Sequence, residues 1–292
     1  MQAIHDITVQ RPGWVIFEMP EVLRTVDLAD ENRVAAKFAG AQLLNAGRQA
    51  IQDLEDVRRV SAGLFPRNLP RLASIAYAGV CIEASVAGGD FYDFFDRGPH
   101  RLGLAVGDVS GKGMAAALLR ATLQASLRTL GSMGVDDFQL SLTLANRLLL
   151  ESAPEAMYAS LFFAEYDERS RRLKYVNCGH PAPGLLRGHR VSWLQPTATV
   201  LGLFNDWHCS VAEVHLEPGD TLLLYTDGVT EATDGTGEEF GQDRLLALLK
   251  ARNQVPLSML LQECVNGVGR FTQGDPCDDL TLVGLRCLEQ EI

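Results

Sequence analysis

The sequence has no excess of basic residues, and this lack disfavours a nucleic-acid partner. Of its 292 residues, 26 are Lys or Arg and 37 are Asp or Glu, so the formal net charge is −11. Binding to a phosphate backbone requires many Lys and Arg contacts, so we expect no nucleic acid among its partners. An acidic balance instead fits an enzyme that binds cations. Hydrophobic residues make up 47% of the chain, which is long enough to bury a full core.

Long apolar runs are also lacking. No run approaches the roughly 20 residues that a membrane-spanning helix needs. The stretch from Ala115 to Leu119, for example, is interrupted by Arg120. The first residues contain no basic region leading into an apolar stretch, so we find no secretory signal. These features predict a cytoplasmic protein without a transmembrane segment.

Paired cysteines are missing as well. The chain has six cysteines, but no two of them form a Cys-x-x-Cys motif. Without a secretory signal, a disulfide framework is not expected in a chain of this length, so we predict reduced and mostly buried thiols. Cys178-Gly-His180 contains two residue types that bind zinc, but no second pair at a suitable spacing accompanies it.

Proline is absent between Glu31 and Leu64, where Ala, Gln, Leu, Arg and Glu are common. Apolar or small residues recur there at steps of three and four, which predicts a helix that Phe65-Pro66 ends. Gly40 and Gly47 interrupt the heptad pattern of a coiled coil. Two interpretations stay open, since the helix either packs on its own domain or pairs two copies of the chain.

After about Pro70 the chain alternates strand-like runs with glycine-rich turns. Strands and helices come in blocks and not in strict alternation, which favours an α+β fold with antiparallel sheets. The expected strands are 74–85, 91–95, 102–109, 158–166, 173–177, 211–216, 221–225 and 280–287. The expected helices are 112–130, 138–150, 244–249 and 257–268. We predict an N-terminal arm with a regulatory or dimerising helix over 1–65 and one domain over 66–292.

Aspartates stand at four places beside glycine or a second aspartate, each next to an apolar run. These places are Gly88-Gly89-Asp90, Gly107-Asp108-Val109, Thr226-Asp227-Gly228 and Asp278-Asp279. Carboxylates that meet at one rim of a sheet repel each other unless they share a cation. Oxygen ligands of this kind suit Mg²⁺ and Mn²⁺. Any single Asp-Gly pair equally fits a turn, so composition alone leaves both interpretations open.

The order of these motifs resembles the SpoIIE/RsbU-type serine phosphatases of the metal-dependent protein phosphatase superfamily, which are similar to protein phosphatase 2C. The resemblance covers about Val57 to the last residue. It rests on Gly88-Gly-Asp-Phe-Tyr-Asp93, Gly107-Asp-Val-Ser-Gly-Lys-Gly113, Asn177-Cys-Gly-His-Pro181, Leu224-Tyr-Thr-Asp-Gly-Val229 and Asp278-Asp-Leu-Thr281. It implies a four-layer α-β-β-α sandwich of two antiparallel sheets flanked by helices, preceded by an N-terminal helix. The chain departs from the family pattern at Glu83 and Ala87, where Pro and Val are usual, and at Cys178, where Ala is usual.

The resemblance also implies a centre of two Mn²⁺ or Mg²⁺ ions, with a third ion left open. Asp108 would bridge both ions, and the Val109 carbonyl would complete one coordination shell. Asp90 would bind the second ion, while Asp227 and Asp278 would bind the first. The implied metal ligands are Asp90, Asp108, Val109, Asp227, Asp278 and Asp279, the last chiefly as a neighbour that orients the shell. The implied catalytic residues are Asp108 and Asp227.

The activity implied is hydrolysis of phosphoserine or phosphothreonine on a protein by a hydroxide that bridges the two ions. No covalent phosphoenzyme would form. The substrate implied is a phosphorylated STAS-type anti-anti-sigma factor, which places the protein in sigma factor regulation, stress response and signal transduction. An activating partner on the N-terminal helix and a homodimer are further expectations. The alternatives are a non-catalytic interaction module and a small-molecule phosphoesterase on the same fold.

Four neighbouring polar residues receive separate predictions. Ser110 is expected to cap the helix that begins near Lys112. Lys112 itself would either reach a phosphate oxygen or stay solvated or bound to backbone. His180 would act as a general acid or hold the turn 177–181 by hydrogen bonds, and the sequence favours the second role. Asp93 is predicted to support the site from outside the metal shell or to be structural.

Overall fold

The computed structural model describes residues 28–67, 69–133, 137–153, 156–274 and 277–289. The chain divides into two compact units, residues 1–53 and 54–292. The N-terminal arm predicted before residue 28 lies outside the described residues. Among the described helices, none combines the length and the apolar character needed to cross a bilayer.

Helix α1 (Leu28–Leu64) confirms the helix predicted from the proline-free region. It ends directly before Phe65-Pro66, because the residue that precedes a proline is disfavoured in a helix. In the first unit, Leu44 and Ile51 of this helix are exposed. Its pairing with a second copy stays a prediction. Its last turn belongs to the second unit, where Ser61 is buried.

The second unit contains two five-stranded antiparallel sheets, as expected. The first sheet has the order β1 (Ile75–Ile82), β10 (Leu280–Cys287), β9 (Thr221–Tyr225), β6 (Gly184–Arg187) and β7 (Arg190–Trp193). The second sheet has the order β2 (Phe91–Asp96), β3 (Arg101–Val109), β4 (Ala159–Asp167), β5 (Arg172–Cys178) and β8 (Ala212–His215).

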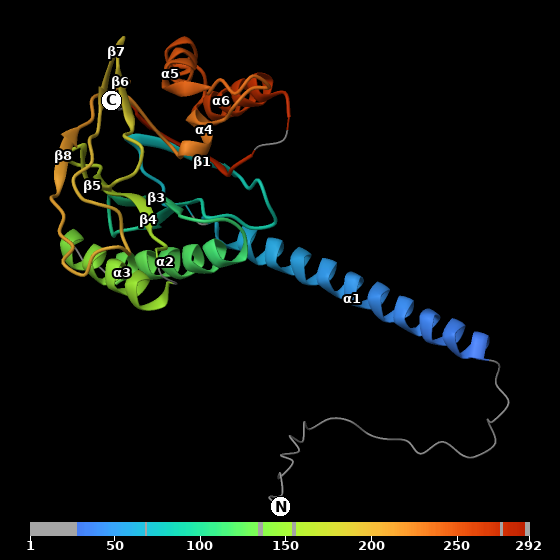
Figure 1. The fold of residues 1–292 in the computed structure, drawn as a ribbon. Coiled ribbons are helices and arrows are strands. Elements are labelled where there is room, and N and C mark those ends of the chain that lie inside the picture. Colours follow the sequence, from blue (N-terminus) through green and yellow to red (C-terminus); the bar gives the residue numbers. More distant parts are fainter. Residues whose placement is uncertain (1–27, 68, 134–136, 154–155, 275–276, 290–292) are drawn as a thin grey trace, which may run out of the picture. The chain divides into compact units, whose positions relative to one another are not determined.

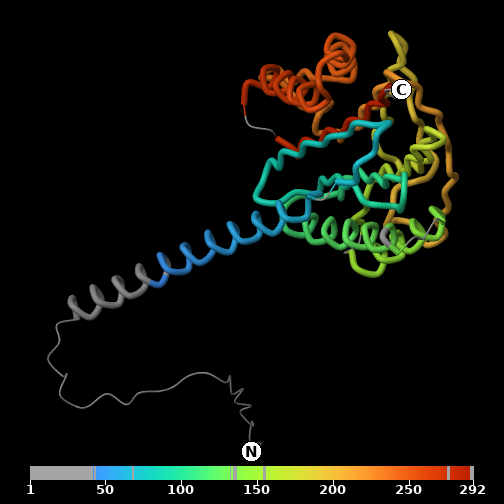
Figure 2. Tube along the Cα trace, turned by 180° about the vertical axis from the view of Figure 1, so that it is seen from behind, coloured from blue at the N-terminus to red at the C-terminus, as the bar shows by residue number. Residues whose placement is uncertain are grey.

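Helices cover the outer face of each sheet and complete four layers. Helices α2 (Met114–Ser132) and α3 (Phe138–Ser152) pack on the second sheet. Helices α5 (Gly241–Arg252) and α6 (Leu257–Thr272) pack on the first. Figure 1 shows these two helix pairs on opposite sides of the strands, and Figure 2 shows the same layers from behind. The predicted α-β-β-α sandwich is therefore confirmed.

The two-residue repeat of β3 explains how this strand separates two cores. Leu104 and Val106 face the core between the sheets, whereas Ala105 faces α2. On that helix-facing side Gly103 leaves room for the ring of Phe95, because an added Cβ would overlap the ring. The small residues of β3 therefore let aromatic rings of β2 fill the space beneath α2.

Two local expectations need correction. The short strands β6 and β7 are absent from the sequence prediction, and the first three residues of β6 form a buried run without two-residue alternation. Helix α2 begins at Met114 with Gly113 as its N-cap residue, so the prediction that Ser110 caps it is wrong. The Ser110 hydroxyl instead accepts a hydrogen bond from the Tyr158 N–H (2.9 Å), and the Ser110 N–H donates to the Tyr158 carbonyl (2.8 Å). Ser110 thus joins the end of β3 to the start of β4.

Replacing Gly103 by alanine is expected to lower the free energy of unfolding by about 1–3 kcal/mol, because the added methyl group would overlap the buried Phe95 ring. The matched control is Gly269→Ala in α6, where an added Cβ meets no atom within 4 Å. There the free energy of unfolding should rise by about 0.4–1 kcal/mol, since alanine restricts the unfolded chain. Urea unfolding measures both, and equal effects would contradict the packing around Gly103.

Candidate metal centre

The five aspartates predicted to bind metal lie at strand ends that meet at one end of the sandwich. Asp90 immediately precedes β2, and Asp108 is the next-to-last residue of β3. Asp227 follows β9 and begins the short helix α4 (Asp227–Thr230), whereas Asp278-Asp279 precede β10. Because β9 and β10 are antiparallel neighbours, the end of one lies beside the start of the other. Both sheets therefore contribute carboxylates to the same place.

Strand periodicity decides which carboxylates enter this space. In β3, Asp108 shares its face with Leu104 and Val106, which line the core between the sheets. Asp90 likewise lies two residues before Tyr92, which packs against that core. Asp93 has the opposite parity and faces α2, where it pairs with Arg128 (2.7 Å). Asp93 is therefore structural, as one of its two predicted roles states, and does not join the other aspartates.

The charges of these carboxylates act on one another. Burial, followed by the charges of Asp227, Asp278 and Asp279, raises the pKa of Asp108 to about 7. Burial and then the charge of Asp108 raise the pKa of Asp90 well above its usual value. Burial also raises the pKa of Asp227. Each negative charge thus raises the free energy needed to ionise its neighbours. A bound divalent cation would have the opposite effect and favour the ionised carboxylates.

The double glycine before Asp90 allows backbone to approach the carboxylates closely. A Cβ added to Gly89 would overlap the Val109 carbonyl oxygen and lie 3.1 Å from Asp108 Oδ1. A Cβ added to Gly88 would overlap the Asp279 carboxylate. Glycine is required at both positions because any side chain would displace these oxygen atoms.

Hydrogen bonds fix the carboxylates of Asp90 and Asp279. The Thr226 hydroxyl donates to Asp90 Oδ2 (2.6 Å), and Asp90 is only 2% exposed. Asp279 accepts from the Ala84 N–H (2.9 Å) and from the Asp90 N–H (3.4 Å). Asp279 therefore holds the loop that carries Asp90, and its predicted role of orienting the metal shell stays a prediction.

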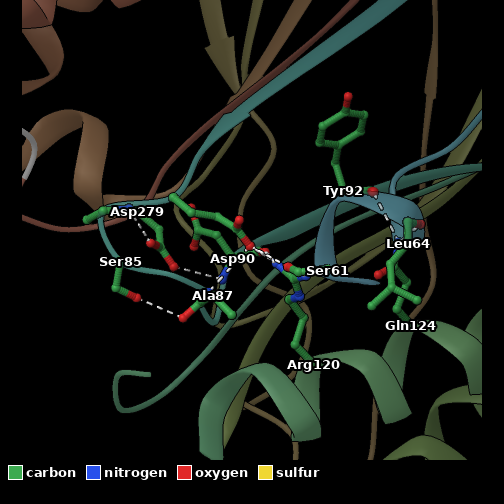
Figure 3. A network of polar contacts seen from close by, with 12 residues as sticks. Ser61, Leu64, Ser85, Ala87, Asp90, Tyr92, Arg120, Gln124 and Asp279 are labelled. Carbon is green, nitrogen blue, oxygen red and sulfur yellow. Dashed lines mark hydrogen bonds and ion pairs between the residues drawn. The ribbon is translucent and has the colours of Figure 1, made fainter. Parts of the chain in front are cut away.

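A buried arginine holds the same loop from the other side. Arg120 of α2 is 1% exposed and donates to the Asp90 carbonyl (2.8 Å), to Glu83 (2.9 Å) and to the Ser61 hydroxyl (2.5 Å). Ser61 in turn donates to Glu83 (2.6 Å). Figure 3 shows Arg120 between Ser61 and the Asp90 loop, with Asp279 beyond that loop. The last turn of α1, helix α2 and the metal-site loop thus share one polar network.

Two further side chains of α2 bind the end of α1. Gln124 donates to the Leu64 carbonyl (2.9 Å), and Arg128 donates to the same oxygen (2.8 Å). Arg120, Gln124 and Arg128 are spaced by four residues, so they lie along one face of α2. This face supplies donors to a carbonyl group that the end of a helix leaves without an intrahelical partner.

Lys112 lies at the rim of the candidate centre. Its ammonium group pairs with Asp278 Oδ2 (2.9 Å) and donates to the Cys277 carbonyl (3.1 Å). The structure therefore agrees with the predicted backbone-bound lysine. Its reach toward a phosphate stays untested.

His180 is buried and holds its own turn. Its Nδ1 lies 2.9 Å from the Ser160 hydroxyl, and its backbone N–H donates to Asn177 Oδ1 (2.8 Å). Burial lowers the pKa of His180 to about 3, so the imidazole is neutral near pH 7. These contacts agree with the structural role that the sequence favours over general-acid catalysis.

The donor set fits Mg²⁺ or Mn²⁺ in chemistry. It consists of carboxylate oxygens and the Val109 carbonyl, which are hard ligands. In the part of the chain that the structure describes, no three His, Cys, Asp or Glu side chains stand close enough together to hold a metal ion as they lie. The Cys178–His180 pair does not fit zinc, because Cys178 is fully buried and burial raises its thiol pKa.

Sequence reasoning misses the residues that support the centre. Arg120 is a charged residue within a run of small and aliphatic residues, which marks it as a buried cation in need of a partner. Glu83, which departs from the family pattern, is that partner. No local pattern marks Ser61 or Thr226, because their hydrogen-bond partners are distant in the sequence. Ser61 bonds Glu83, 22 positions away, and Thr226 bonds Asp90, 136 positions away.

A family model described as stage II sporulation protein E (SpoIIE) matches residues 98–288, which is more than half of the chain. The chain is 27% identical over 249 residues to phosphoserine phosphatase RsbU of Bacillus subtilis, covering 84% of this chain and 73% of RsbU. It is 28% identical over 263 residues to protein IcfG of Synechocystis sp., covering 80% of this chain but only 41% of IcfG.

A solved structure described as the SiaA-PP2C domain of Pseudomonas aeruginosa superposes with a TM-score of 0.72 at 22% identity. The match covers 82% of this chain and 98% of that domain. At this identity the likeness shows a shared fold.

Removing the Arg120 cation is expected to destabilise the fold by about 3–5 kcal/mol, because Arg120→Met leaves Glu83 without its buried partner. Glu83→Gln combined with Arg120→Met should cost less than the sum of the single changes, with a coupling of about 0.5–3 kcal/mol. The matched control is the exposed pair Arg147–Glu151, where Arg147→Met should leave the free energy of unfolding nearly unchanged. Additive losses in urea unfolding would show that Arg120 and Glu83 act independently.

The buried histidine makes stability depend on pH. The pKa of His180 in the folded protein, about 3, lies below the unfolded value of 6.5, so the unfolded chain binds the proton more readily. Its stabilising contribution is present above about pH 6.5 and is lost as the pH falls toward 3, by about 2 kcal/mol at pH 5. His180→Asn should remove this part of the loss between pH 7 and pH 5. The exposed His208→Asn variant is the control, and identical pH profiles for all three proteins would rule out the effect.

Proposed function

Because the chain belongs to the SpoIIE family, we propose that it is a metal-dependent protein phosphatase that hydrolyses phosphoserine or phosphothreonine. One observation carries the proposal. Carboxylates from both sheets meet at one rim, where burial and then the neighbouring negative charges raise the pKa of Asp108 to about 7. Such a cluster is costly to keep charged unless it serves to bind cations.

The residues that would hold two Mn²⁺ or Mg²⁺ ions, with a third left open, are Asp90, Asp108, the Val109 carbonyl, Asp227, Asp278 and Asp279. Asp108 is proposed to bridge them, and Asp108 and Asp227 are the proposed catalytic residues. When bound, the ions would activate water for attack on phosphorus and neutralise the phosphoryl oxygens.

The remaining residues of the site position these ligands. Gly88 and Gly89 keep the Asp90 loop against Val109 and Asp279, so that the oxygen atoms of both sheets face one space. Arg120 fixes the carbonyl of Asp90 and leaves its carboxylate to the site.

Neither Cys178 nor His180 is suited to covalent catalysis. Burial raises the pKa of the Cys178 thiol and lowers that of His180, so the first is a poor nucleophile and the second a poor acid near pH 7. These states support direct attack of water on the phosphate ester, without a phosphoenzyme.

The proposed substrate is a phosphorylated STAS-type anti-anti-sigma factor. The likeness to RsbU, named a phosphoserine phosphatase, supports phosphoserine as the target. Residues 1–65, an N-terminal arm and a regulatory or dimerising helix, remain the proposed regulatory region ahead of a catalytic domain over 66–292. The helix is the proposed docking site for an activating partner or for a second copy in a homodimer. The polar contacts of Ser61 and Leu64 support this role. Arg120 links Ser61 to the loop of Asp90, and Gln124 links Leu64 to α2.

Hydrolysis of p-nitrophenyl phosphate tests the proposed chemistry. Turnover should require Mn²⁺ or Mg²⁺ and stop in EDTA. Asp108→Asn should lower kcat by more than the about 10–100-fold typical of residues that only support a metal ligand. The matched control is Asp206→Asn, an exposed aspartate paired only with His208, which should keep normal turnover.

Binding of Mn²⁺, measured by titration calorimetry, separates the alternatives. Absence of both turnover and Asp108-dependent Mn²⁺ binding would favour the non-catalytic interaction module. Turnover of small phosphate esters without turnover of any phosphoserine protein would favour the small-molecule phosphoesterase.

A further inference from the structure

A groove of about 460 Å³ lies beside the candidate metal centre and shares Asp227 and Asp278 with it. One wall is the turn at Thr233–Gly235, and the other is the second half of α6. Its volume falls within the about 300–1,000 Å³ of typical ligand pockets. We call it the rim groove. Apart from the shared Asp227 and Asp278, its lining contains no side chain that is proposed to hold the ions.

The wall formed by the turn is held in place by its own hydrogen bonds. Asp234 Oδ1 accepts from the Thr236 N–H (2.8 Å), the Thr236 hydroxyl (2.7 Å) and the Glu238 N–H (3.0 Å). An antiparallel bridge joins Thr233 to Glu239. A turn with this many internal bonds is preorganised, so binding against it needs little ordering.

The other wall is a helix anchored in the core. Leu260, Leu261, Cys264 and Val268 of α6 are buried against the first sheet. Gly269, one residue beyond Val268, is exposed on the groove, and a Cβ added there meets nothing within 4 Å. Both walls are therefore fixed, and the space between them is open.

The lining of the rim groove combines an apolar floor with an acidic rim. The floor contains Ile82, Val265, Val268 and Leu280. At the rim Glu231 is exposed next to the metal-site carboxylates.

Charge at the rim is unbalanced. Among the described lining residues Lys112 is the one basic side chain, and Asp278 already pairs with it. Glu231 and Asp234 line the groove and are not among the proposed metal ligands, so their charge remains when ions are bound. This acidic rim attracts a positively charged ligand group, and the floor accepts an apolar one.

We propose that the rim groove binds the peptide segment that flanks the phosphoserine of the substrate, with an apolar side chain on the floor and a Lys or Arg beside Glu231. The proposal rests on the proposed phosphatase function. A phosphoserine held at the centre must send its neighbouring residues, about 3.8 Å apart, over the adjoining surface. Because the rim groove shares two side chains with the centre, it is continuous with the place where the phosphate would lie.

The test compares two substrates of different size. The Gly269→Trp variant should narrow the groove while keeping the α6 backbone, since the position is exposed and open. The kcat/KM for a phosphoserine peptide with Leu and Lys beside the phosphoserine should fall at least about 10-fold relative to the kcat/KM for p-nitrophenyl phosphate. Met259→Trp is the matched control, because Met259 is an exposed residue of the same helix outside the groove.

The charge preference is tested at Glu231. The native protein should hydrolyse the Lys-flanked phosphopeptide faster than an Asp-flanked one, and added salt should weaken this preference. Glu231→Lys should reverse it.

Each result decides between distinct conclusions. No Mn²⁺-dependent hydrolysis of either substrate by the native protein would overturn the proposed phosphatase function and the groove proposal with it. Hydrolysis of both substrates, with a peptide-to-ester ratio that Gly269→Trp does not change more than Met259→Trp, would overturn the groove proposal alone. If the Glu231→Lys variant kept the preference for the Lys-flanked peptide, the proposal that a basic substrate residue lies beside Glu231 would be wrong.

Discussion

Repulsion among carboxylates at one end of the sandwich is the constraint on which the rest of the site depends. Asp108 is partly buried, and burial followed by the charges of Asp227, Asp278 and Asp279 raises its pKa. Hydrophobic burial of the strands brings these residues to the rim, so the fold itself creates the repulsion. A site of this kind favours the binding of divalent cations, because bound cations neutralise the carboxylates and remove the free-energy cost of charging them.

The surrounding structure keeps the carboxylates in place despite this repulsion. Thr226 donates to Asp90, backbone N–H groups donate to Asp279, and Arg120 binds the carbonyl of Asp90. Arg120 is itself a buried charge, and Glu83 compensates it. The departure from the family pattern at Glu83 is thus part of a local ion pair that this chain uses to support its loop.

The same network brings the end of α1 into contact with the site. Arg120 bonds Ser61, and Gln124 and Arg128 bond the Leu64 carbonyl, all from one face of α2. Movement of this last turn would disturb hydrogen bonds that also hold the Asp90 loop. The rim groove lies by contrast between α6 and the Thr233–Gly235 turn, so the proposed substrate contacts and the helix contacts use separate elements of the second unit.

The sequence alone determined most of the fold and the identity of the candidate ligands. Strand periodicity is a local pattern and was enough for most strands, whereas the candidate ligands followed from the resemblance of the ordered Asp motifs to a known family. Composition alone left a turn equally open at each of them. Strand β6 has a run of buried residues without alternation, and the sequence prediction missed it together with its partner β7. Only the tertiary structure decided the Arg120–Glu83–Ser61 network, the true partner of Ser110 and the rim groove. These features join residues that lie far apart in the chain, and long-range side-chain contacts leave no periodic trace in a single sequence.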